Sequence, residues 1–178
     1  MKGFTSLTWV VMLTAPLVFG QKMTDQKFVN DAAQGNMTEA HLGQMAQSKG
    51  ASEDVKQYGQ RLESDHKAAY DKLTAAASSS LTVPKGIDTK HQAIIKRFER
   101  LSGKAFDHQF QQAMVQDHQK DIAEYERASK DLQSTALREY ASQSLPVLRN
   151  HLQMARELNK KASPLSQRHA TPGHRRGI

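Results

Sequence analysis

Residues 24–50, TDQKFVNDAAQGNMTEAHLGQMAQSKG, are the stretch that decides the fold class. Mostly apolar and small residues recur in it at alternating intervals of three and four, the spacing of one face of an α-helix. That face comprises Phe28, Ala32, Gly35, Glu39, Leu42 and Ala46. Thr24 can cap the first turn and Gly50 can end the last one. The stretch therefore predicts a helix over about residues 24–48.

The same spacing recurs further along the chain, and strand-like alternation of β-branched residues is absent. It predicts long helices over residues 53–77, 106–132 and 134–161, and a short helix over residues 88–101. Residues 78–86 contain Ser, Pro and Gly and predict a loop that carries the chain across one end of a bundle. Pro146 lies inside the last helix and should kink it. The pattern as a whole predicts an all-α, up-down four-helix bundle with one short extra helix before the third long helix.

The first 20 residues have the layout of a secretory signal peptide. Lys2 precedes an apolar middle, and small residues precede a cut ahead of Gln21. The apolar run is short beside the roughly 20 residues that a membrane span needs, so we expect cleavage rather than anchoring. The sequence therefore predicts a signal peptide over residues 1–20 and a bundle domain over residues 21–162. We expect the mature protein to be periplasmic or secreted, with no transmembrane helix after the leader is removed.

Composition excludes several classes of protein. The chain has no cysteine, so its stability must come from packing or from a ligand rather than from disulfides. It has 25 Lys and Arg against 18 Asp and Glu, but part of this excess lies in residues 163–178. That segment has no periodicity and predicts a disordered basic tail, with only weak attraction to anionic surfaces. The remaining charge is too small to predict nucleic-acid binding.

Four polar residues occupy the apolar helix faces: Glu39, His66, His118 and His151. Burying such groups without partners costs several kcal/mol, so they must meet one another, a metal or trapped water inside the bundle. Counted from the first turn at about 1.5 Å per residue, Glu39 and His66 differ in height by about 7 Å. Glu63 is nearly level with Glu39 on the same count. His118 and His151 differ by about 4 to 5 Å, so convergence of the four is plausible.

Glu63-x-x-His66 is the spacing that ferritin-like di-iron proteins carry on two of their helices. The match is partial, because Val115 and Leu148 stand three residues before the other two histidines. One interpretation is that Glu39 and the three histidines hold a single zinc, iron, copper or manganese ion, with Glu63 as a further ligand. A metal-free, hydrogen-bonded core is the other. No nucleophile elbow or phosphate-binding glycine loop occurs, so any enzymatic activity would depend on the metal, and the sequence favours a protein that is not an enzyme.

Several short motifs are similar to those of a known bacterial exported family. They are Ala33-x-Gly35-Asn36-x-x-Glu39-x-x-Leu42-Gly43, Asp65-His66, Gly103-x-x-Phe106-Asp107, Met114-Val115-x-Asp117-His118 and Leu145-Pro146-x-Leu148-x-x-His151-Leu152. Over about residues 24–160 the chain resembles the family called domain of unknown function 4142, whose members are often labelled predicted outer membrane proteins. The resemblance implies a ferritin-like four-helix fold. It also implies that Glu39, His66, His118 and His151 are the site residues, because they fall within the family's motifs. Glu63 lies outside that pattern.

Overall fold

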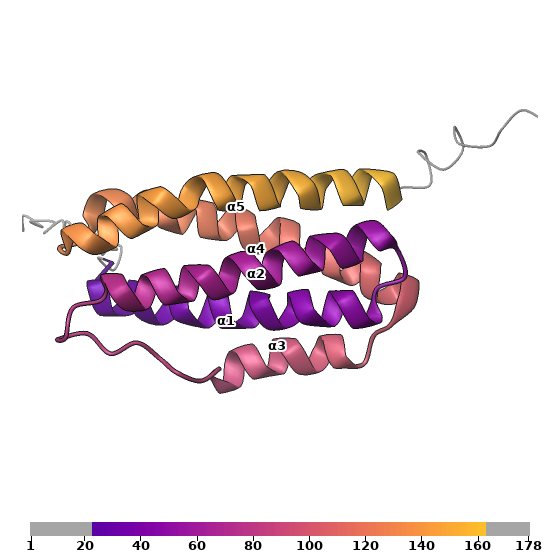
Figure 1. Cartoon of the computed structure of the whole chain (residues 1–178), viewed down its shortest axis with the longest axis horizontal. Helices are drawn as coiled ribbons and strands as arrows, with labels where there is room; N and C mark the ends of the chain where they lie inside the picture. The colour runs from indigo at the N-terminus through magenta and orange to yellow at the C-terminus, as the bar shows by residue number, and fades with distance from the viewer. Residues whose placement is uncertain (1–22, 163–178) are drawn as a thin grey trace, which may run out of the picture.

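A computed structural model describes residues 23–162 and shows an all-α protein (Figure 1). The helices are α1 (Asp25–Lys49), α2 (Glu53–Ala76), α3 (Thr89–Glu99), α4 (Gly103–Asp131) and α5 (Thr135–Ala162). No strand occurs between residues 23 and 162. The predicted signal peptide and basic tail lie outside the described residues.

The helices begin where the sequence supplies caps. Thr24 accepts a hydrogen bond from Lys27 N at the start of α1, and Ser52 accepts one from Val55 N at the start of α2. The prediction for α4 was wrong by three residues, because this helix begins at Gly103 and not at Phe106. Gly103 has a φ of 60°, so the chain makes a sharp turn there and enters the helix at once. Gly103 is therefore both the turn after α3 and the first residue of α4.

The order of helix directions differs from a simple up-down bundle. Gly50, after the end of α1, forms an isolated bridge with Gly103 at the start of α4, so α4 runs antiparallel to α1. Because α1 and α2 are joined by a short turn, α2 and α4 point the same way. The physical reason is the segment between them: residues 78–88 and α3 take the chain back along the length of the bundle, beside α1, instead of across one end (Figure 1).

Two aspartates join the ends of the helices. Asp107, the fifth residue of α4, accepts hydrogen bonds from Ala51 N and Ser52 N, both at 2.9 Å, in the turn between α1 and α2. Asp25 in the first turn of α1 accepts from Gln133 N at 2.8 Å and Ser134 N at 2.9 Å, in the turn between α4 and α5. Each carboxylate satisfies two turn N–H groups that have no partner inside a helix, and thereby sets the offset of one helix pair against the other.

These two anchors belong to an internal repeat. Asp25 and Asp107 are 82 residues apart, and the same interval separates further pairs with the same or similar side chains. The pairs are Phe28 and Phe110, Glu39 and Asp121, Ala46 and Ala128, Ser52 and Ser134, Val55 and Leu137, and Tyr58 and Tyr140. The α1–α2 hairpin and the α4–α5 hairpin are thus two versions of one unit, packed so that each anchors the turn of the other.

Apolar side chains fill the two ends of the molecule and leave a polar zone between them. One cluster includes Phe28, Leu73, Tyr125, Leu137 and Tyr140, and the other includes Leu62, Phe98, Phe106, Phe110 and Met114. Between them lie the four polar residues of the apolar faces, all of them at most 4% exposed. One predicted core position was wrong: Gly35 is partly exposed, and a Cβ there would meet nothing within 4 Å. No helix within residues 23–162 is long and apolar enough to cross a membrane.

Candidate metal centre

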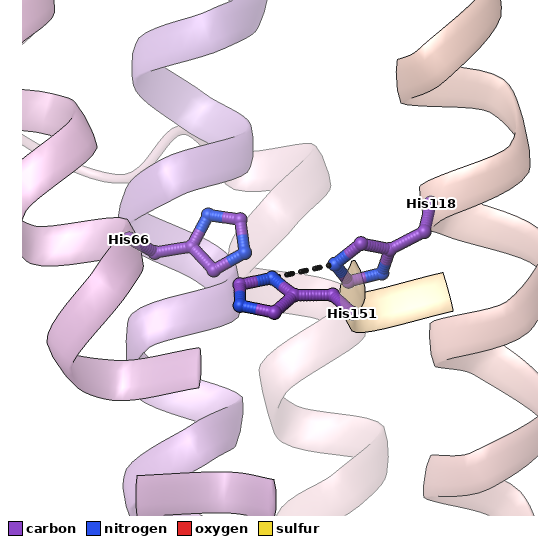
Figure 2. Close-up of side chains that lie close together, drawn as sticks. All are labelled: His66, His118 and His151. Carbon is purple, nitrogen blue, oxygen red and sulfur yellow. Dashed lines mark hydrogen bonds between the residues drawn. The ribbon is translucent and has the colours of Figure 1, made fainter. Parts of the chain in front are cut away.

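Three helices bring three histidines together at the middle of the molecule. His66 comes from α2, His118 from α4 and His151 from α5, and their rings point toward one another (Figure 2). Each offers a ring nitrogen, and these three atoms all lie within 4.8 Å of one another. His118 Nε2 and His151 Nδ1 are 3.2 Å apart. Among the residues that the structure describes, this is the group with spacing suited to a metal ion.

Glu39 joins the three histidines from α1, the remaining long helix. Its Oε2 lies 3.1 Å from His66 Nε2 and 3.4 Å from His118 Nε2. The structure therefore brings together the four polar residues that the helical spacing placed on the apolar faces. The height difference expected between Glu39 and His66 does not keep them apart, because helical side chains lean toward the N-terminus of their helix. In antiparallel α1 and α2 the two leans bring these side chains toward the same level.

The outer nitrogen of each imidazole is held by an acceptor. His66 Nδ1 lies 2.9 Å from Asn36 Oδ1, and Asn36 Nδ2 donates to Tyr140 Oη, which leaves the amide oxygen to face His66. His118 Nδ1 lies 2.9 Å from the carbonyl oxygen of Met114, which can only accept. These contacts place the N–H on Nδ1 in both rings. Their Nε2 atoms therefore carry a lone pair when the rings are neutral.

His151 is oriented in the same way through its other nitrogen. Its Nε2 lies 3.0 Å from Asp65 Oδ2, and that carboxylate is also paired with Arg61. The N–H of a neutral His151 ring therefore sits on Nε2, and Nδ1 carries the lone pair. A carboxylate or carbonyl acceptor behind each imidazole is the arrangement that orients histidines bound to metals.

The inner atoms of the centre consequently face one another without donors. Glu39 Oε2 and His66 Nε2 are buried and have no hydrogen-bond partner within the described part of the chain. His118 Nε2 and His151 Nδ1, joined by the dashed line in Figure 2, lie at hydrogen-bond distance. With the N–H of each neutral ring on its outer nitrogen, both inner atoms carry lone pairs, so a proton or a metal ion must lie between them. Two ligands bound at about 2.0 to 2.2 Å to one tetrahedral ion are about 3.3 to 3.6 Å apart. The separations of 3.1, 3.2 and 3.4 Å are close to this range.

Electrostatics keep these groups in the states that bind cations. Burial lowers the pKa of His118, although Glu39 opposes the shift. Burial and the neighbouring His66 and His118 lower the pKa of His151 to about 4. Burial alone would raise the pKa of Glu39, but His118 and His66 hold it well below its usual range. At neutral pH the centre therefore presents a carboxylate and, at His118 and His151, uncharged imidazoles.

Two further carboxyl groups on α4 surround Glu39. Burial and the charge of Glu39 raise the pKa of Asp121 well above its ordinary value, and Asp121 also hydrogen-bonds to Glu39. Burial and the same charge raise the pKa of Asp117 to about 6. Two carboxyl groups can share a hydrogen bond only through a proton, so Asp121 holds the proton and donates to Glu39, and a cation bound there could displace that proton.

Glu63 lies apart from the four converging residues. Its carboxylate contacts Gln47 Nε2 and Lys67 Nζ, both at 2.6 Å, and its side chain is 20% exposed. Glu63 has the height along α2 that was expected, but its side chain does not reach the centre. Its place is at the edge of the α1–α2 contact.

Asn36 and Asp121 were not predicted as part of the site, and no partner was predicted for Asp65. Asp121 follows His118 by three residues, the mirror order of the Glu-x-x-His spacing, so only a search in both directions would have found it. The 82-residue repeat is a second signal, because it pairs Asp121 with Glu39. Asn36 precedes Glu39 by three residues on the same face of α1, and is equivalent to His118 in the repeat.

Two pockets each reach two of the four converging residues. One, of about 410 Å³, lies between α2 and α5, has alanines along its α2 side, and reaches His66 and His151. The other, of about 520 Å³, lies between α1, α3 and α4 and reaches Glu39 and His66. We call them the alanine pocket and the acidic pocket. The centre is buried, and one pocket lies on each of two sides of it.

The sequence profile of one protein family, the domain of unknown function 4142, matches residues 18–158. The chain belongs to this family. The match confirms the resemblance expected from the motifs and spans all five helices except the last turn of α5. No curated protein and no solved structure matches the chain. Membership of this family therefore assigns no activity to the chain.

Proposed function

We propose that this protein binds one transition-metal ion at the centre of the bundle, through Glu39, His66, His118 and His151. One observation carries the proposal: each histidine has its outer nitrogen held by an acceptor, so that lone pairs face one another inside. Lone pairs 3.1 to 3.4 Å apart repel unless a proton or a metal ion lies between them. Three imidazoles and one carboxylate suit zinc, iron, copper or manganese.

The fold supports the same interpretation. We infer that α1, α2, α4 and α5 form a ferritin-like four-helix bundle, because four long helices joined by one long crossover are the topology of that fold. Ferritin-like proteins build metal sites from side chains on facing helices in the bundle core. Here each of the four long helices contributes one ligand. The role that follows is metal handling, or redox chemistry if the ion is iron, copper or manganese.

The experiment is metal analysis of protein purified without an affinity tag, followed by melting curves with and without chelator. We expect about one equivalent of a transition metal. A ligand at a hundred times its Kd stabilises the folded state by about 2.7 kcal/mol. Removing it should therefore lower the Tm by roughly 5 to 10 °C. His118→Gln and His151→Gln should abolish both the bound metal and the chelator effect, whereas His108→Gln, at an exposed site on α4, should change neither.

The rival is a structural or partner-binding bundle whose polar centre holds no metal. In that case a doubly protonated His66 would form an ion pair with Glu39 across their 3.1 Å separation. Chelator would then leave the Tm unchanged, while His66→Gln would still cost about 1 to 3 kcal/mol by leaving Glu39 buried without a donor. Less than about a tenth of an equivalent of metal, with no response to added zinc, iron or copper, would refute metal binding.

We also propose that the chain is exported to the periplasm or beyond. The layout of residues 1–20, with Lys2 before an apolar middle and small residues before Gln21, supports this. Intact-mass measurement of the exported protein should show a mature form that begins at Gln21. A full-length mass in the membrane fraction would contradict it.

A further inference from the structure

The acidic pocket separates its charges by depth. The four carboxylates along its wall, Asp31, Asp117, Asp121 and Glu124, are all half-buried, and Glu39 at its inner end is 4% exposed. The lysines that line it, Lys27, Lys90 and Lys120, are all exposed. Lysine side chains extend their ammonium groups toward water. The negative charge therefore lies inside the pocket and the positive charge at its rim.

α4 contributes three acids to the lining of the acidic pocket. Asp117, Asp121 and Glu124 stand at intervals of four and three, which places them on one face of the helix. None of the three forms an ion pair within residues 23–162, whereas Asp31 is paired with Lys27. Burying unpaired acids costs free energy, so their retention on this face is unexplained by packing alone.

A second observation points to what the pocket admits. Glu39 Oε2 is buried, has no donor in the described part of the chain, and belongs to a residue that lines the inner end of this pocket. Asp121 is in hydrogen-bond contact with the Glu39 carboxylate. Carboxyl groups thus line the pocket up to an unpartnered oxygen of the centre, and hydrated divalent cations bind such oxygens readily.

We propose that the acidic pocket is the path along which a divalent cation reaches and leaves the centre, attracted by Asp117 and Glu124 and passing Asp121, which contacts Glu39. This inference rests on the proposed function. Clefts lined by one sign of charge raise the association rate of the opposite charge about 10- to 1000-fold, in a way that salt screens. The alanine pocket has mainly apolar walls beside the centre. Its charged lining residues are Asp65, Glu139 and Lys72, and Asp65 is already paired with Arg61 and His151, so this pocket supplies no comparable attraction.

The test is the rate at which cobalt chloride binds to chelator-stripped full-length protein, followed by the visible absorption of Co²⁺ in a stopped-flow instrument at low ionic strength. Glu124→Gln and Asp117→Asn should each slow association about three- to tenfold, and the double variant more. The effect should shrink in 0.5 M KCl. Lys120→Gln, which removes a positive charge at the rim, should accelerate association. Final absorption of Glu124→Gln should equal that of the wild type, since Glu124 is not a ligand.

The matched control is Glu139→Gln, which removes a carboxylate from the alanine pocket and should change the rate less than twofold. Unchanged rates in Glu124→Gln and Asp117→Asn would overturn the proposed path, and so would slower binding in Glu139→Gln than in Glu124→Gln. Absence of any cobalt absorption in the wild type would be a different result. It would refute the centre itself, and the path with it.

Discussion

The α1–α2 hairpin and the α4–α5 hairpin share their ends and differ in their middles. Asp25 and Asp107 each hold the other hairpin's turn, and Ser52 and Ser134 cap the second helix of each. At the centre most equivalent positions, 82 residues apart, hold different residues: Asn36 is equivalent to His118, His66 to Leu148 and Ala69 to His151. Backbone donors in a turn need the same partner in both copies. The middle has no such requirement, and there the two copies have become complementary parts of one centre.

Asp107→Ala should have the largest effect on the shared ends. It leaves two turn N–H groups without their charged acceptor, which should cost about 3 kcal/mol of unfolding free energy. Asp25→Ala removes the same two bonds, but its turn is more exposed, so water can replace them and the loss should be about 1 to 2 kcal/mol. Urea unfolding of both variants measures the difference. Equal losses would show that exposure of the turn does not matter.

Gly43→Ala tests a difference in how closely each hairpin is packed. A Cβ at Gly43 would lie 2.5 Å from Gly59 O and 2.8 Å from Glu63 N, both backbone atoms of α2, so α1 and α2 would have to separate. The equivalents in the other hairpin are Tyr125 and Ala141, which allow no such approach. We expect a net loss of about 2 kcal/mol, after the gain from better helix propensity. A thermal melt with unchanged Tm would contradict this close contact.

Asp65→Asn tests the complementary middles. Asp65 holds the outer nitrogen of His151, and loss of such a partner lowers metal affinity about 10- to 100-fold without removing a ligand. Competition with a chelator of known affinity measures the change. Asp71→Asn, at an exposed acid on the same helix, is the matched control and should bind as the wild type. If both variants bind equally well, Asp65 serves only its ion pair with Arg61.

Gly35→Ala should have the smallest effect and the opposite sign. Gly35 lies inside α1 with open space around its Cα, so an added methyl group meets nothing within 4 Å. Alanine in a helix interior is favoured over glycine by about 0.8 to 1 kcal/mol, and we expect a stabilisation of that size in urea unfolding. A loss of stability would mean that the methyl group disturbs the acidic pocket that Gly35 lines.

Much of the local structure could be predicted from the sequence. Caps such as Thr24 and Ser52 act within one turn, so four of the five helices begin within one residue of expectation. The faces that carry Glu39 and the three histidines follow from the period of the helix, which is also a local property. Glu63 was placed by its height and by its spacing from His66. Its contact with Lys67 is local to α2, but its contact with Gln47 depends on how α1 is offset against α2.

The sequence by itself determined that the chain is helical, where most helices begin, and which polar side chains face inward. Only the tertiary structure decided the direction of α4, the level at which the four side chains meet, and the assignment of Asn36, Met114 O and Asp65 as their outer partners. The physical reason is range. Period and capping act over a few residues, whereas the offset of the two hairpins depends on hydrogen bonds that join residues 55 to 109 positions apart.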